Sequence, residues 1–285
     1  MKSNSFAPKL FLGLAGLAVG WLPSSSLAFP PAPPHQIYGL VRDQYGTPIS
    51  VGGWTVTLVT TNGAQISAPI VPFMGLGVNF SLTVLMDGGS HPGAYTATAL
   101  SPTAKYLLQV SNGTTTNTPI EMTHGLMTLG RPADSTQVNL TLGTDSVGDG
   151  LPDQWKNTIV LLSGGTIQFG DIHPNSYPPG GRMTYWQDFI AGTYPWDPGS
   201  EFQIQMVSMN GVTSTIELPV TQGRVYSLQG SSDFINWTPL SFQITGGGPG
   251  GLQYGAYQST AAGVLQVSVS PMQPGTNQFF RGQVQ

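Results

Sequence analysis

Three aspartates spaced four residues apart surround a glycine in the middle of the chain, and this pattern is typical of a calcium-binding loop. Asp145, Asp149 and Asp153 take positions 1, 5 and 9 of the segment, and Gly150 takes position 6. Calcium is a hard cation that prefers about six to eight oxygen ligands, and such a loop offers it alternate side chains and the position 7 carbonyl. Position 7 is Leu151, so we expect its backbone oxygen to be a ligand.

Two positions of the segment depart from the calcium pattern. Position 3 is Val147, whose side chain has no oxygen, and position 12 is Lys156, where a bidentate carboxylate is usual. A distant acid, Asp171 or Asp188, would have to complete the shell of ligands. The alternative interpretation is an aspartate-rich turn without metal, in which Asp149 accepts N–H groups from the first turn of the following helix.

The segment Asp145–Trp155 resembles the thrombospondin type 3 calcium-binding repeat, whose pattern is Asp-x-Asp-x-Asp-Gly-Leu-Pro-Asp-x-Trp-Glu. Residues 181–198 are similar to the end of a second repeat, with Asp188 where the terminal acid belongs. The front of that second copy lacks the three expected acids. The resemblance implies a secreted bacterial protein, of a kind found in Verrucomicrobia and Planctomycetes, that binds calcium at the first repeat.

The flanking segments resemble other modules of such secreted proteins. Residues 37–48 are similar to the first strand and turn of carboxypeptidase-regulatory-like sandwich domains. Residues 226–240, together with Phe279-Phe280-Arg281 near the chain end, are similar to a C-terminal β module. These resemblances imply a location outside the cytoplasm and a calcium ion, but they imply no reaction.

Composition limits the classes of protein that the chain can belong to. Only 8% of the 285 residues are charged, against about 25% in an average soluble protein. The net charge is −4 and lysine and arginine form no cluster, so we exclude a nucleic-acid-binding protein. The absence of cysteine excludes disulfides and cysteine-ligated zinc. The 38 glycines and 24 prolines, with few charges, favour a mainly β protein with many turns.

The first 28 residues have the features of a secretory signal peptide. Lys2 and Lys9 precede an apolar run from Leu10 to Leu22, and Ser26-Leu27-Ala28 supplies small residues for cleavage. The apolar run is shorter than the ~20 residues that a membrane-spanning helix needs. Because no longer apolar run follows, we expect no transmembrane segment in the mature chain, which we place outside the cell, in a periplasm or at the cell surface.

The remainder divides into four segments by composition. Residues 29–35 are a Pro-rich leader that we expect to be extended and mobile. Residues 36–142 alternate apolar and polar side chains between turns, which predicts a β-sandwich. Residues 143–200 form an acidic linker, and residues 201–285 return to β alternation, as expected of a small C-terminal β-sandwich.

Two short helices are predicted within the linker. One begins near Leu151-Pro152, since proline is tolerated in a first helical turn, and includes Trp155. The other covers residues 183–191, with Met183, Trp186, Phe189 and Ile190 on one apolar face and Gly192 as its C-cap.

Catalytic and sugar-binding patterns are weak in this sequence. The run Asp87–His91 holds an acid, a hydroxyl and an imidazole, but it has the composition of a loop between strands. The four histidines show no HExxH spacing, although His173 lies near Asp171 and would be the one to touch a metal. Among the aromatic side chains, Tyr194 and Trp196 are expected to be exposed, whereas we expect the following to pack in cores: Trp54, Trp186 and Trp237.

These patterns favour an exported, non-enzymatic structural or adhesive protein whose linker binds calcium and makes the two β domains rigid. Its metal ligands would be Asp145, Asp149, Leu151 (carbonyl) and Asp153, completed by Asp171 or Asp188. Its partner would be a cell-surface polysaccharide or protein. The alternatives are a carbohydrate-binding module or another extracellular binding protein, and an extracellular hydrolase whose site has no recognisable pattern.

Overall fold

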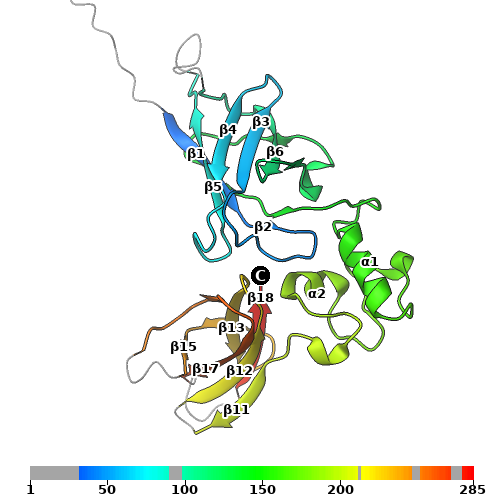
Figure 1. Ribbon diagram of the computed structural model, residues 1–285. Coiled ribbons are helices and arrows are strands. Elements are labelled where there is room, and N and C mark those ends of the chain that lie inside the picture. The colour runs from blue at the N-terminus through cyan, green and yellow to red at the C-terminus, as the bar shows by residue number, and fades with distance from the viewer. Residues whose placement is uncertain (1–31, 90–97, 211–212, 246–250, 271–277) are drawn as a thin grey trace, which may run out of the picture. The chain divides into compact units, whose positions relative to one another are not determined.

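The chain is mainly β, as its composition predicts. The computed structural model describes residues 32–89, 98–210, 213–245, 251–270 and 278–285 (Figure 1). The predicted signal peptide, residues 1–28, lies outside these residues, as do the last two residues of the Asp87–His91 run. Among the described helices, none is long and apolar enough to cross a membrane.

The N-terminal module, residues 32–142, consists of short strands in three small sheets (Figure 1). One sheet has the order β5-β1-β9, a second pairs β10 with β2, and the third has the order β4-β3-β6-β7 with β8 on β6. The strands are β1 (Ala32–Gly39), β2 (Val41–Arg42), β3 (Thr55–Thr60), β4 (Gln65–Pro69), β5 (Phe80–Met86), β6 (Lys105–Ser111), β7 (Thr116–Asn117), β8 (Met127–Thr128), β9 (Ser135–Gln137) and β10 (Leu140–Thr141).

Alternation of side chains explains why these strands bury a common core. Every second residue of β3 is buried, and β5 and β6 follow the same rule. A strand presents successive side chains to opposite faces, so one face of each sheet supplies the apolar cluster. The cluster includes Ile37 of β1, Val56 of β3 and Leu108 of β6.

The strand β1 takes in residues that the sequence places in the Pro-rich leader. It begins at Ala32, which pairs with Met86 of β5, and the pairing shifts register between Ala32 and His35. Pro33 and Pro34 lie in that irregular stretch, where a missing backbone N–H breaks no regular ladder bond. The expected mobile leader therefore does not extend to His35.

The linker has a hydrophobic core of its own. It contains the helices α1 (Asp153–Leu162) and α2 (Tyr185–Ala191) and the single-turn 3-10 helices η2 (Phe169–Asp171) and η3 (Pro198–Ser200). Trp155 of α1 meets Phe189 of α2 edge to face, with 5.3 Å between ring centroids. The buried members of this cluster are Leu151, Trp155, Ile159, Ile167, Ile172, Tyr185 and Phe189.

Both helices lie where the sequence predicts them, but α2 presents a different face. Gly192 ends α2 in the left-handed conformation, as a C-cap glycine does, and Thr184 begins it with a capping box. Tyr185 and Phe189 are buried, whereas Trp186 is 39% exposed. The prediction that Trp186 packs in a core is therefore wrong, because the Trp155 ring of α1 meets the neighbouring face of α2, which carries Tyr185 and Phe189.

The C-terminal module, from Gln205 onward, has two four-stranded sheets that share a core (Figure 1). The first has the order β11-β12-β17-β15, and in the second β13 pairs with β14, β16 and β18. The core joins Ile216 of β12 and Val267 of β17 to Leu228 of β13. The strands are β11 (Gln205–Met209), β12 (Ser214–Val220), β13 (Val225–Ser231), β14 (Thr238–Leu240), β15 (Phe242–Ile244), β16 (Tyr257–Gln258), β17 (Gly263–Val269) and β18 (Phe279–Val284).

Replacing Trp155 should destabilise the linker far more than replacing Trp186. Trp155→Ala removes a ring that is 6% exposed and leaves a cavity, which costs about 3–5 kcal/mol, whereas Trp186→Ala removes a half-exposed ring. The free energy of unfolding in urea measures both. Equal losses in the two variants would contradict the assignment of Trp155 to a packed linker core.

Candidate functional site

The acidic loop is organised by hydrogen bonds from its own backbone. The Asp145 carboxylate accepts the N–H groups of Gly148 (2.8 Å), Asp149 (3.2 Å) and Gly150 (2.7 Å). Gly148 and Gly150 have φ values of +77° and +90°, which favour glycine and let the chain wrap around the carboxylate. Partial burial would raise the pKa of Asp145, but the three N–H donors and the Lys156 ammonium lower it below its usual value.

Asp149 forms an ion pair with the buried Lys156. The Lys156 Nζ lies 2.6 Å from Asp149 Oδ2, while the other carboxylate oxygen accepts the N–H of Leu151 at 3.1 Å. Lys156 is only 1% exposed, and its ammonium lies 5.3 Å from the centre of the Phe169 ring. His173 Nδ1 is 3.7 Å from the same Asp149 oxygen. The histidine thus lies beside Asp149, whereas the sequence placed it near Asp171.

Asp153 fastens the loop to the start of α1. Its carboxylate accepts both the N–H and the hydroxyl of Ser146, each at 3.1 Å, and the hydroxyl of Thr144 at 3.2 Å. Asp153 is also the acid in the first turn of α1, where a negative charge is favourable. The side chain of Asp149 accepts the N–H of Leu151, which lies before α1. The N-cap residue of α1 is Pro152.

The two acids predicted to complete a metal shell lie in other parts of the linker. Asp171 ends η2, and Asp188 lies within α2. Asp188 is 1% exposed, one carboxylate oxygen accepts the hydroxyl of Thr193, and no described group bonds to the other. Burial raises the pKa of Asp188 to about 6, the Thr193 hydroxyl lowers it in part, and the charge of Glu201 adds to the rise.

This arrangement does not fit a calcium ion. Within the described ranges, no three His, Cys, Asp or Glu side chains are grouped as a metal site requires. Both oxygens of Asp145 already accept N–H groups, and Asp149 faces an ammonium. Because calcium needs about six to eight oxygens, this loop offers too few free ones. Calcium binding therefore stays a prediction from the sequence that the geometry does not support.

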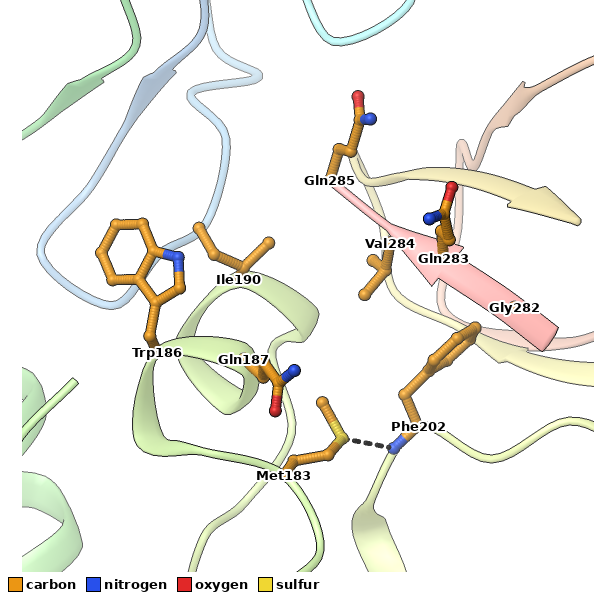
Figure 2. Close-up of a pocket in the computed structure, with 9 residues that line it drawn as sticks. All are labelled: Met183, Trp186, Gln187, Ile190, Phe202, Gly282, Gln283, Val284 and Gln285. Atoms are coloured by element: carbon orange, nitrogen blue, oxygen red, sulfur yellow. Dashed lines mark hydrogen bonds between the residues drawn. The ribbon is translucent and has the colours of Figure 1, made fainter. Parts of the chain in front are cut away.

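A shallow cavity of about 440 Å³ lies between α2 and the last strand, β18 (Figure 2). Its side chains are apolar or carry amides, and the N–H of Phe202 donates to Met183 Sδ at 3.3 Å. Such a lining suits the packing of apolar or amide groups and offers no acid or base. The lining residues are Met183, Trp186, Gln187, Ile190, Phe202, Gly282, Gln283, Val284 and Gln285.

The candidate sugar-binding aromatics are exposed to different degrees. Tyr194 is 55% exposed, as predicted, and its ring centroid lies 5.1 Å from that of Trp196, which is half-buried against the linker core. Trp54 packs on the N-terminal core, as predicted. Trp237, which the sequence predicts in a core, is not part of the C-terminal core cluster, and its indole lies 4.4 Å from the Arg281 guanidinium.

Two buried charged residues contribute contacts that sequence reasoning missed. The Glu201 carboxylate accepts the N–H groups of Arg182 and Met183 just before α2. Arg224, which is 2% exposed, donates to the carbonyl oxygens of Ile190 (2.6 Å) and Gly46 (3.1 Å). Their partners lie far away in sequence, so no local pattern predicts these contacts. The sequence indicates them only in that charged residues are few in this chain.

Replacing Asp188 by asparagine should raise the unfolding free energy at neutral pH and change it less at acidic pH. The folded-state pKa of about 6 exceeds the unfolded value near 3.8, so the folded chain loses stability as the pH rises from about 4 to 6. Asp188→Asn removes this loss, worth up to ~3 kcal/mol. Urea unfolding of both proteins at pH 4 and pH 7 measures it, and a difference independent of pH would contradict the burial of a charged Asp188.

A scan of protein-family models gives no match to this chain. A search of curated protein sequences gives no significant match either. The resemblance to the thrombospondin type 3 repeat therefore rests on the residues of the two segments 145–155 and 181–198 alone.

Proposed function

We propose that the chain is a non-enzymatic structural or adhesive protein that works outside the cytoplasm. In this proposal the linker is a folded connector that holds two β modules in a defined arrangement. The N-terminal signal-like segment and the absence of cysteine suit an exported protein that depends on packing for its stability. The partner would be a polysaccharide or a protein of the cell surface.

The observation that carries this proposal is the pair of hydrogen bonds made by Arg224. The residue belongs to the turn before β13, yet its guanidinium reaches the end of α2 at Ile190 and the turn after β2 at Gly46. Hydrogen bonds from a charged donor contribute about 1.5–3 kcal/mol each. One buried side chain of the C-terminal module thus bonds to the linker at Ile190 and to the N-terminal module at Gly46.

Close backbone approaches around Arg224 support the same function. A Cβ at Gly192 would lie 2.6 Å from the guanidinium carbon of Arg224, and a Cβ at Gly46 would lie 2.6 Å from the carbonyl oxygen of Phe189. Both glycines have positive φ values, so each is required by conformation as well as by space. Such contacts, without room for a methyl group, are expected of a connector that transmits orientation.

Removing the Arg224 guanidinium should loosen the connection between the modules. We expect Arg224→Met to lower the unfolding free energy by about 2–4 kcal/mol and to increase the radius of gyration in small-angle X-ray scattering. Arg281→Met is the matched control, because Arg281 is exposed and its cation–π contact with Trp237 stays within one module, worth ~1 kcal/mol. Unchanged scattering in Arg224→Met would overturn the role of this arginine as a connector.

Carbohydrate binding is a second candidate function, favoured by the exposed ring of Tyr194 beside Trp196. Adjacent aromatic rings offer apolar faces on which a sugar can stack.

We expect Tyr194→Ala to reduce retention on an insoluble polysaccharide at least tenfold, whereas Tyr45→Ala, which removes another exposed tyrosine, leaves it unchanged. Equal retention of both variants would exclude this site. Release of sugar from the polysaccharide by the unaltered protein would favour the hydrolase alternative.

A further inference from the structure

The Lys156 ammonium lies beside acids that the sequence pattern assigns to calcium. It contacts Asp149, at position 5, and it helps lower the pKa of Asp145, at position 1. These two residues carry the first two carboxylates along the calcium-loop pattern. A positive charge therefore already stands among the acids that the sequence pattern assigns to the metal.

The position of Lys156 in the pattern explains why its side chain points inward. It is the twelfth residue from Asp145, and in a calcium loop this residue carries a bidentate carboxylate directed at the ion. A lysine side chain is one bond longer than glutamate, so its ammonium reaches beyond the place of a ligand toward the place of the ion itself. The side chain is enclosed, with the Phe169 ring beside the ammonium.

We infer that Lys156 supplies the cation of this loop, so that a covalently attached ammonium takes the place of calcium and the linker folds without metal. The charge of one ammonium balances Asp149 directly. The carboxylate of Asp145 is satisfied instead by three backbone N–H groups. A calcium ion entering the loop would be repelled by the buried ammonium and would have to displace it. A displaced ammonium would lose its partner Asp149 and leave a buried, uncompensated positive charge.

The inference predicts how the melting temperature responds to calcium and to substitution of Lys156. For the unaltered protein, millimolar calcium chloride and excess chelator should give melting temperatures within about 1 °C of each other, since no ion adds to folding. Lys156→Met should lower the melting temperature by roughly 5–15 °C, because the partly buried Asp149 carboxylate loses its ammonium partner. Lys105→Met is the matched control, since Lys105 is exposed and its ammonium donates to the exposed Thr128 hydroxyl, and it should change the melting temperature little.

Two further variants separate an ion pair from a merely apolar contact. Asp149→Asn combined with Lys156→Met should restore most of the lost melting temperature, since both charges are then absent. Lys156→Glu restores the carboxylate of position 12 and removes the ammonium, so its melting temperature should rise by about 5 °C or more with calcium and fall again with chelator.

Three results would overturn the inference. One is a calcium-dependent rise in the melting temperature of the unaltered protein that Asp149→Asn abolishes. A second is a Lys156→Met protein as stable as Lys105→Met. A third is a folded Lys156→Glu protein that ignores calcium. If Lys156→Glu does not fold in either condition, the comparison of Lys156→Met with the Asp149→Asn double variant decides. None of these outcomes depends on the arrangement of the β modules, so they leave the connector function to its own test.

Discussion

A single ion pair between the buried Lys156 and the partly buried Asp149 supports the structure of the linker. It ties the acidic loop to the first turn of α1, and α1 brings Trp155 and Ile159 into the linker core. The second helix packs on this core through Phe189 and then ends at Gly192, beside Arg224. Because a short segment buries little apolar surface, α1 depends on the ion pair for its orientation, and α2 depends on its packing against α1. The connection to the C-terminal module therefore begins at the loop.

Several of the few charged residues lie at buried positions, where most of them have a defined partner. Lys156 and Arg224 are both nearly inaccessible, and each bonds to oxygen atoms. Asp188 is the exception, because one of its buried oxygens has no partner among the described residues and its pKa is raised to about 6. A group of this kind reduces stability at neutral pH, and the hydrophobic cores of the protein must offset that loss.

Local patterns in the sequence predict the elements, whereas the partners of buried charges depend on the fold. Alternation in Thr55–Thr60 predicts β3, and Gly192 predicts the end of α2, because each signal lies within a few residues. The exposure of Trp186 could not be predicted, since it depends on which face of α2 meets Trp155. Arg224 bonds to Gly46 across 178 positions of sequence, and no spacing rule connects them.

Lys156 shows why the spacing of acids predicts a cation but not its kind. Three carboxylates in nine residues need a positive charge, and both a metal ion and an ammonium supply one. An ammonium has three donors and one charge, so it satisfies fewer oxygens than calcium does. The remaining oxygens must then accept hydrogen bonds from the chain itself. The N–H groups around Asp145 and the Ser146 contacts of Asp153 meet this requirement, so the loop's hydrogen bonding is what an internal cation demands.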